Sequence, residues 1–242
     1  MTGVFLRQTR GNAAGSGPAL PESPGVAGTV SRVTEPFIRQ YRVADRADVA
    51  DICVRTAAAG GDARGVYSSD DLMPEVYALP YVDHSPDLAW VVEHEGRAAG
   101  YIVAAADTQA FAEWWAREWT PGFVARHPEP GPATGAHPAY TEAQLLRDGA
   151  DPERMVRGLR NGELTTHPAH LHIDLLPVLQ RRGLGSRLID TLRAALAERD
   201  VPGVHLGYAA ENLAARMFYD RYGFTELPSS TPTSPLLGIA SS

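Results

Sequence analysis

The sequence contains no lysine, a single cysteine and no long apolar run. All 22 Lys+Arg positions are therefore arginine, which argues against a kinase-like or nucleotide-binding loop, because both common kinds of phosphate loop rely on a lysine. The one cysteine, Cys53, excludes an internal disulfide and a cysteine-based zinc cluster, and its spacing from Val49 and Ile52 favours a core position. No stretch reaches the roughly 18 apolar residues that a membrane-spanning helix needs.

Positive charge is also in deficit. Acidic residues number 29 against 22 basic ones, so the formal net charge is -7. A chain without clustered positive charge is not expected to bind nucleic acid, whereas a cationic partner would suit it. No apolar segment follows the charged start, so no secretory signal is predicted. We expect a cytoplasmic protein without a membrane partner, and the bias toward arginine and alanine is typical of a GC-rich bacterial genome.

The order of the expected elements predicts one domain behind a tail. Residues 1–35 are rich in Gly, Ala, Ser and Pro without a sustained period, which is typical of a flexible tail. The remainder, 36–242, alternates strand and helix patterns and predicts an α/β (α+β) fold with a mixed sheet flanked by helices. Strands are expected over 37–43, 88–94, 98–106, 170–176, 204–206 and 235–240, and helices over 45–59, 70–78, 183–199 and 212–222.

A long helical insertion, 108–165, interrupts this pattern. It opens with Phe111, Trp114, Trp115 and Trp119, continues through a proline-rich loop and ends in short helices. A connection of this length is usually functional, so we expect a lid or binding loop near the acceptor site. The alternative is that the tryptophans fill core.

The most informative motif is Gln180-Arg181-Arg182-Gly183-Leu184-Gly185-Ser186, between an expected strand and a strong helix. Its glycines let backbone N–H groups approach a ligand, and the helix N-terminus adds unpaired donors and a positive dipole end. Together these features predict a pyrophosphate-binding loop, although a plain glycine-rich helix start is the alternative. The motif is a poor dinucleotide fingerprint, because Leu188 stands where a third glycine would be.

A second motif follows at 212–224, Asn-Leu-Ala-Ala-Arg-Met-Phe-Tyr-Asp-Arg-Tyr-Gly-Phe. Seven residues are close to two helical turns, so Asn212 and Tyr219 share a face. In order and spacing, the two motifs resemble the GNAT superfamily of N-acetyltransferases. Within it, the string 168–174, the hairpin around Gly96–Tyr101 and the insertion resemble the acetyltransferase-like C-terminal domain of O-GlcNAc hydrolases and its stand-alone bacterial relatives.

The resemblance implies a mixed sheet that splays open between the strand before Gln180 and the strand at Val204, with acetyl-CoA bound in the gap and CoA as product. It implies that Asn212 holds the pantetheine arm and that Tyr219 is the general acid for the departing thiolate. The implied cofactor-binding residues are Ile173, Asp174, Leu175, Arg181, Arg182, Gly183, Leu184, Gly185, Ser186, Asn212 and Tyr219.

Proton handling is expected on the strand that leads into the loop. A lysine-like amine must lose its proton before it attacks a thioester, at a cost of about 4–5 kcal/mol at pH 7, so a general base is expected. By strand parity, His170, His172 and Asp174 share one face. We take Asp174 as base or base-orienter, with His172 as the main rival and His170 acting through water as a further one. A buried hydrogen-bond network and a metal chelate are the other interpretations, and no metal is predicted.

The predicted activity is acetyl transfer from acetyl-CoA to an amine by direct attack. The acceptor is left open between a small molecule and a peptide or protein amine, and homodimers are common among relatives of the fold. The alternative is a catalytically silent CoA-binding or protein-interaction module of the same fold, with the tryptophan-rich insertion as its contact surface.

Overall fold

The computed structural model describes residues 35–128 and 141–242. The expected tail therefore lies outside the described residues except for Glu35, and so does most of the proline-rich loop. The sheet has the strand order β1-β2-β3-β4-β5-β7-β6. Its strands are β1 Phe37–Gln40, β2 Ala89–His94, β3 Arg97–Ala105, β4 Ala169–Leu175, β5 Gly203–Gly207, β6 Thr225–Glu226 and β7 Leu236–Ala240.

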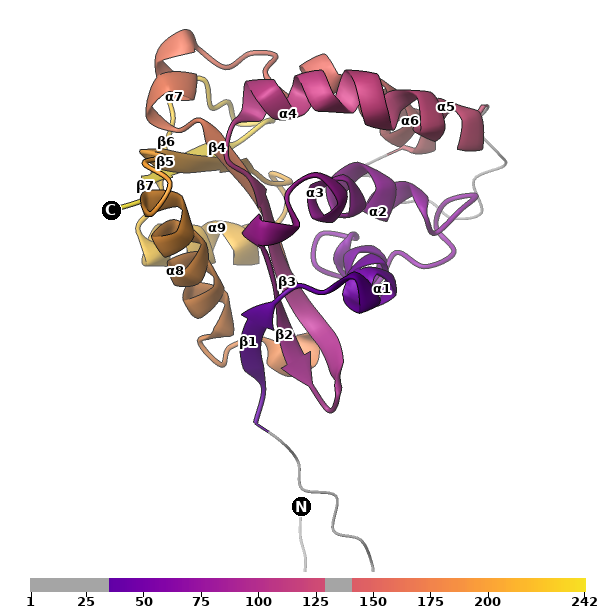
Figure 1. Ribbon diagram of the computed structural model, residues 1–242, viewed down its shortest axis with the longest axis horizontal. Coiled ribbons are helices and arrows are strands. Elements are labelled where there is room, and N and C mark those ends of the chain that lie inside the picture. Colours follow the sequence, from indigo (N-terminus) through magenta and orange to yellow (C-terminus); the bar gives the residue numbers. More distant parts are fainter. Residues whose placement is uncertain (1–34, 129–140) are drawn as a thin grey trace, which may run out of the picture. The chain divides into compact units, whose positions relative to one another are not determined.

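The sheet is mixed and splayed, as expected. All its pairs are antiparallel except β4 with β5, which run parallel. That parallel pair is held only by Ala169 opposite Val204 and His170 opposite His205. Beyond His170 the described strands β4 and β5 have no further register, although β4 stays paired with β3 as far as Leu175. One edge of β4 is thus left open toward β5, and Figure 1 shows the two strands leading in different directions.

Helices cover both faces of the sheet. They are α1 Arg46–Thr56, α2 Leu72–Tyr77, α3 Leu79–His84, α4 Thr108–Trp114, α5 Thr120–Arg126, α6 Glu142–Ala150, α7 Asn161–Thr166, α8 Leu184–Ala197 and α9 Leu213–Tyr222. Helices α1 to α3 lie on one side of β1 to β3 and α8 on the other (Figure 1). In α8 the apolar stripe Leu188, Leu192 and Leu196 is fully buried, which explains why the helical spacing of its apolar residues predicted this helix from the sequence.

Two elements differ from the sequence-based expectation. No helix was expected between 78 and 88, but Leu79–His84 forms α3, which tolerates Pro80 because it lies in the first turn, where its missing N–H costs no hydrogen bond. Strand β6, of two residues, was not expected. Among the described residues, no helix is long and apolar enough to cross a membrane.

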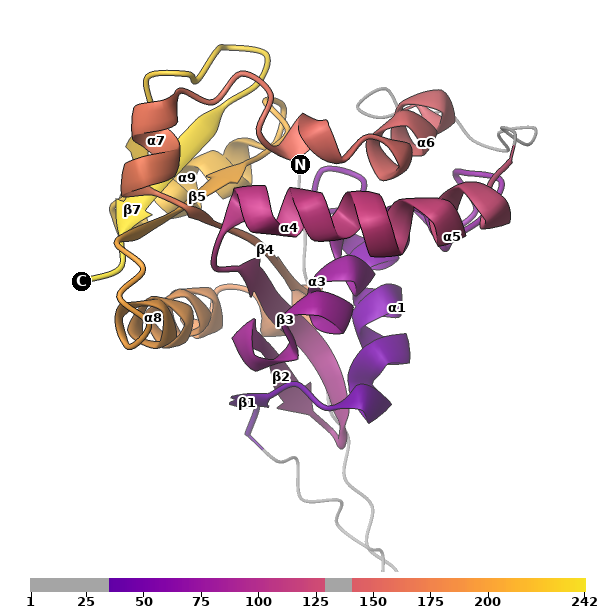
Figure 2. The ribbon, with the colours of Figure 1, turned by 45° about the horizontal axis from the view of Figure 1, so that its top comes forward.

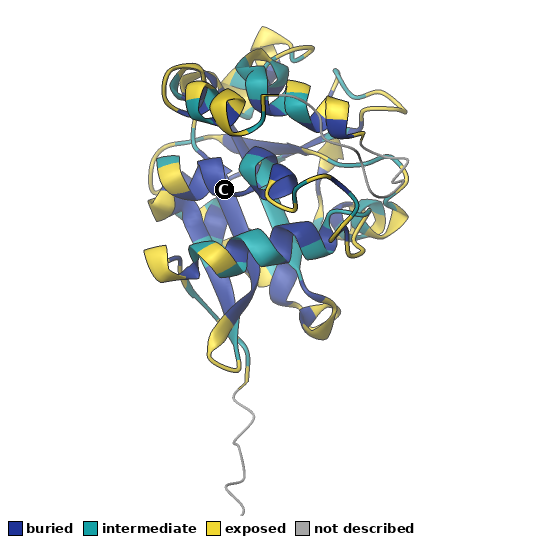
Figure 3. Ribbon diagram, turned by 90° about the vertical axis from the view of Figure 1, so that its right-hand side faces the viewer, coloured by how far each residue is buried: buried dark blue, intermediate teal, exposed yellow. Residues whose placement is uncertain are grey.

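The insertion packs as a further layer. Helices α4 and α5, joined by a π-helical segment Trp115–Trp119, extend over α2 and α3 (Figures 1 and 2). Trp115 and Trp119 are buried, and their indole N–H groups donate to the carbonyl oxygens of Gly149 at 2.9 Å and Glu75 at 3.0 Å. These tryptophans therefore fill core rather than form a contact surface. Figure 3 shows burial over the whole described chain: the strands and the inner sides of the helices are buried, and the outer turns are exposed.

Candidate active site

The loop after β4 has the backbone geometry of an anion site. Arg181 and Gly183 adopt left-handed conformations, with φ of 60° and 74°. Gly183 is the N-cap of α8 and offers no side-chain acceptor, so the N–H groups of the first turn, from Leu184 to Ser186, have no cap. Gln180 fixes the start of the loop, since its Nε2 donates to the carbonyl oxygen of Leu175 at 2.9 Å. The predicted loop is thus a helix N-terminus beside the open edge of β4.

The two glycines of this loop serve different needs. Gly183 has open space around it but requires the left-handed backbone. A Cβ added at Gly185 would lie 3.1 Å from Cζ of Phe218, which belongs to α9. Gly185 therefore lets α8 and α9 approach one another at the mouth of the splayed gap.

Helix α9 supplies the other predicted side chains. Asn212 is its N-cap, and its Oδ1 accepts from the N–H of Ala215 at 3.0 Å, which leaves the Nδ2 group as a donor. Tyr219 is buried against the rings of Phe218 and Phe224. Burial, and then the charge of Asp174, raises the pKa of Tyr219, so its hydroxyl stays protonated at neutral pH.

Asp174 lies on β4 opposite Tyr101 of β3, and the Tyr101 hydroxyl donates to its Oδ2 at 2.5 Å. Burial raises the pKa of Asp174 to about 6, although the hydrogen bond from Tyr101 acts in the opposite direction. A carboxylate with a pKa close to working pH is suited to accept a proton.

His170 and His172 lie on the same face, as strand parity predicted. Nε2 of each ring lies within hydrogen-bond distance of the Tyr81 hydroxyl, at 2.8 Å and 3.1 Å. Burial lowers the pKa of His172 to about 3 and lowers that of His170 well below its usual value. Both rings are therefore neutral near pH 7. Within 35–128 and 141–242, no set of three His, Cys, Asp or Glu side chains is arranged to hold a metal ion.

The other predicted residues lie around the gap. Ile173 and Leu175 are half-buried on the opposite face of β4 from the histidines. Arg182 is exposed and pairs with Glu35 at 3.2 Å, a surface contact that a phosphate could replace at little cost.

Comparison with known proteins decides the family. A model described as an acetyltransferase (GNAT) domain matches residues 151–226, the part of the chain that carries β4, α8, β5 and α9. SsHAT, a protein of known crystal structure, is 40% identical; the match covers 86% of this chain and 100% of SsHAT with a TM-score of 0.75. The chain belongs to the GNAT acetyltransferase family.

More distant GNAT structures share the fold. A variant of agmatine N-acetyltransferase in its apo form is 16% identical, with 86% of this chain and 100% of that one covered and a TM-score of 0.52. PaiA N-acetyltransferase from Thermoplasma acidophilum, in complex with coenzyme A, is 12% identical, with 86% and 99% covered and a TM-score of 0.51. The narrower resemblance to the domain of O-GlcNAc hydrolases stays a prediction.

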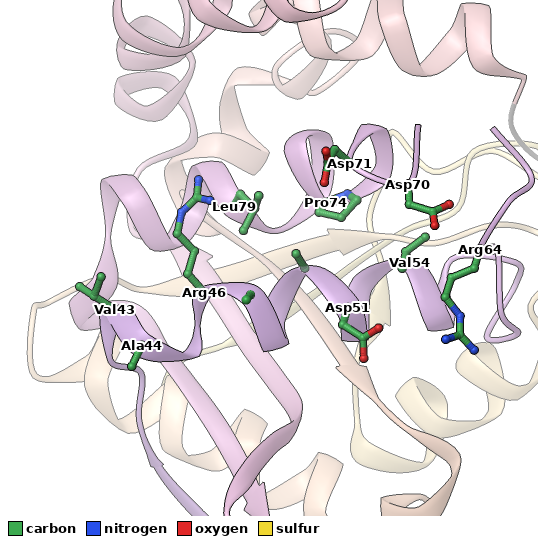
Figure 4. Close-up of a pocket in the computed structure, with 12 residues that line it drawn as sticks. Val43, Ala44, Arg46, Asp51, Val54, Arg64, Asp70, Asp71, Pro74 and Leu79 are labelled. Atoms are coloured by element: carbon green, nitrogen blue, oxygen red, sulfur yellow. The ribbon is translucent and has the colours of Figure 1, made fainter. Parts of the chain in front are cut away.

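A hollow of about 590 Å³ lies away from this GNAT site, on the outer side of α1 (Figure 4). Its charged walls are largely satisfied within the protein, since Arg46 binds Asp83 and Arg64 binds Asp62. None of the predicted cofactor-binding residues lines it. The motif residues lie instead around the gap between β4 and β5, where Gly185 approaches Phe218 and Leu175.

Sequence reasoning missed the partners of the GNAT site. Tyr101 is hydrogen-bonded to Asp174, and Tyr81 and Thr108 contact the histidines; Tyr101 ends the hairpin string noted above, but no role was predicted for any of the three. The one available signal was the alternation of the 98–106 strand, which places Tyr101 beside β4 once the register is known.

Proposed function

We propose that this GNAT acetyltransferase uses acetyl-CoA as donor and transfers the acetyl group to an amine by direct attack. Support comes from one juxtaposition. Asp174 on β4 and Tyr219 on α9 lie near enough for the charge of Asp174 to raise the pKa of Tyr219, so a candidate base and a candidate acid come close together from two elements, next to the point where β4 leaves β5. The coenzyme A complex of a protein with the same fold is consistent with this gap as the cofactor site.

In this proposal the cofactor-binding groups are largely backbone. The N–H groups at the start of α8 bind the pyrophosphate, with Arg181 and Arg182 beside it. The open edge of β4 from Ile173 to Leu175 pairs with the pantetheine arm, and Asn212 Nδ2 donates to the same arm.

The chemistry needs a base on one side and an acid on the other. Asp174 takes the proton from the amine, which attacks the thioester carbonyl, and Tyr219 donates its hydroxyl proton to the departing thiolate. Between the rival bases, Asp174 with a pKa of about 6 is better matched to neutral pH than His172 with a pKa of about 3. Tyr219 is protonated over this range, as a general acid must be.

The deciding experiment is calorimetric titration with acetyl-CoA and with CoA, followed by an amine panel assayed by thiol release. We expect binding at micromolar or lower concentration and acetylation of at least one of spermidine, agmatine, an aminoglycoside and a lysine-containing peptide. Binding without thiol release would favour the silent module instead. Absence of binding would overturn the proposed cofactor site.

A further inference from the structure

A chain of hydrogen bonds, buried at its centre, links the two histidines of the polar face of β4 to Tyr81 and Thr108. The Tyr81 hydroxyl lies between two imidazole rings, 2.8 Å from Nε2 of His170 and 3.1 Å from Nε2 of His172. At its far end, Nδ1 of His170 is 2.8 Å from Oγ1 of Thr108. Thr108 Oγ1 is in turn 2.7 Å from the carbonyl oxygen of Pro168. We call this series the relay.

The carbonyl at one end sets the direction of every proton in the relay. A carbonyl oxygen only accepts, so the single hydroxyl proton of Thr108 points to Pro168, and Thr108 Oγ1 accepts from Nδ1–H of His170. A neutral imidazole carries one N–H, so Nε2 of His170 accepts from Tyr81. Tyr81, its own proton used, accepts from Nε2–H of His172.

The relay therefore leaves His172 with a bare lone pair on Nδ1. Both rings are neutral, because burial and the nearby Arg154 guanidinium lower the pKa of His172, and His205, His84 and Arg154 lower that of His170 in the same direction. Nδ1 of His172 has no hydrogen-bond partner in the described part of the chain. The His172 side chain is only half-buried, so it reaches accessible surface. It does so on the face of β4 that carries Asp174.

We propose that His172 is a positioning residue for the acceptor: its Nδ1, held as a hydrogen-bond acceptor by the relay, receives an N–H of the incoming amine. The inference rests on the proposed function and assigns the approach of the amine to this face. Asp174 remains the proton acceptor, while His172 fixes the direction of the nitrogen lone pair. The site then takes a primary amine. Its two N–H groups are directed to His172 and Asp174, and its lone pair stays free to attack the thioester.

The direction of the hydrogen bonds in the relay can be reversed by Thr108→Val, a change at the end of the relay away from His172. Valine has nearly the same shape but no hydroxyl, so Nδ1–H of His170 loses its acceptor. The arrangement that keeps the buried groups paired then moves every proton by one step: Nε2–H of His170 donates to Tyr81, Tyr81 donates to Nε2 of His172, and His172 carries its proton on Nδ1. Thr120→Val is the matched control, because the Thr120 hydroxyl lies in the same insertion, is buried and has no hydrogen-bond partner among the residues that the structure describes.

The first test is ¹H–¹⁵N correlation of the imidazole rings in the free protein, with His172→Gln to assign the resonance. Wild type and Thr120→Val should show His172 protonated on Nε2 with bare Nδ1, and Thr108→Val the reverse. A wild-type His172 protonated on Nδ1 would overturn the relay. So would a Thr108→Val spectrum identical to wild type.

The second test concerns the amine. Spermidine, agmatine and a lysine-containing peptide are titrated into the CoA-loaded protein, and at least one should shift the Nδ1 resonance of His172; no shift with any of them would overturn the positioning role. In turnover, Thr108→Val should raise the KM of the amine at least about tenfold, because the Nδ1–H of His172 then faces an N–H of the amine. The affinity for acetyl-CoA should stay at the wild-type value. An unchanged KM despite a reversed ring would also overturn it. Failure of the proposed function appears separately, as loss of CoA binding or of acetylation in wild type.

Discussion

The CoA loop and the polar row on β4 face one gap but are built in different ways. The loop from Gln180 to Ser186 offers backbone groups of one short segment, of which Gln180 to Gly183 are exposed, whereas Leu184 and Gly185 are buried. The polar row, His170, His172 and Asp174, uses one buried and two half-buried side chains, whose hydrogen-bond partners come from β3, α3 and α4. In the proposed function, affinity for the cofactor is thus a local property of the chain, whereas control of protons depends on packing between distant segments.

The largest effect is expected from Asp174→Asn, which removes the base and keeps the shape. Turnover should fall about 10³-fold, and the rise of activity with pH through about 6 should disappear from the rate profile. Asp87→Asn, at an exposed carboxylate paired with Arg199, is the control. If the variant still shows the rise of activity near pH 6, Asp174 is not the base.

The same variant should be more stable than wild type at neutral pH. In the folded protein the pKa of Asp174 is about 6, above its ordinary value of 3.8, so folding favours the neutral carboxyl. The stability that this group contributes is therefore fully present at low pH and is lost as the pH rises through 6. Removing the charge should add about 1–3 kcal/mol at pH 7. Thermal unfolding of the variant and of wild type at pH 4 and pH 7 measures this difference in stability. An equal stabilisation at both pH values would contradict a raised pKa of Asp174.

Tyr219→Phe tests the acid from the other side of the gap. Turnover should fall about 10²-fold while CoA affinity stays within about twofold, because the ring still packs on Phe218 and Phe224 and only the proton donor is lost. Tyr208→Phe, whose ring lies 6.0 Å from that of Tyr219, is the control. A wild-type rate would exclude Tyr219 from the chemistry.

Gly185→Val should weaken CoA binding at least about tenfold, because the added carbons push on Phe218 and open the contact between α8 and α9. Gly183→Ala is the informative partner variant, since it meets no atom and only strains the backbone, by about 1 kcal/mol. Calorimetry with CoA separates the two. Equal losses would mean that space at Gly185 does not matter.

The smallest effect is expected from Arg182→Gln, which removes one exposed charge beside the first turn of α8. CoA affinity should fall about threefold at low salt and less at high salt, because an exposed charge is screened. Arg199→Gln is the control, since its charge pairs with Asp87 away from the loop. A loss that does not depend on salt would indicate a direct structural role instead.

Much of the fold could be predicted because its signals are local. The stripe of α8, the hairpin of β2 and β3, and the caps of α9 each depend on residues a few positions apart. Helix α3 was not expected, because it is short and carries Pro80 in its first turn, a position where proline is tolerated but which its sequence does not distinguish from a loop. A lid or binding-loop role for the insertion stays a prediction. Of the two interpretations of its tryptophans, the structure shows Trp115 and Trp119 filling core, which a run of tryptophans alone could not decide because it does not say whether a partner layer covers them.

The sequence by itself determined the family motifs, the glycine loop, the Asn212 and Tyr219 face and the shared face of His170, His172 and Asp174, because each follows from spacing along one element. Only the tertiary structure decided that Asp174 meets Tyr101, that Tyr81 joins two histidines and that Thr108 ends the relay. The physical reason is that a pKa and a tautomer depend on burial and on donors brought from distant segments, and those are fixed only when the sheet and its helices pack together.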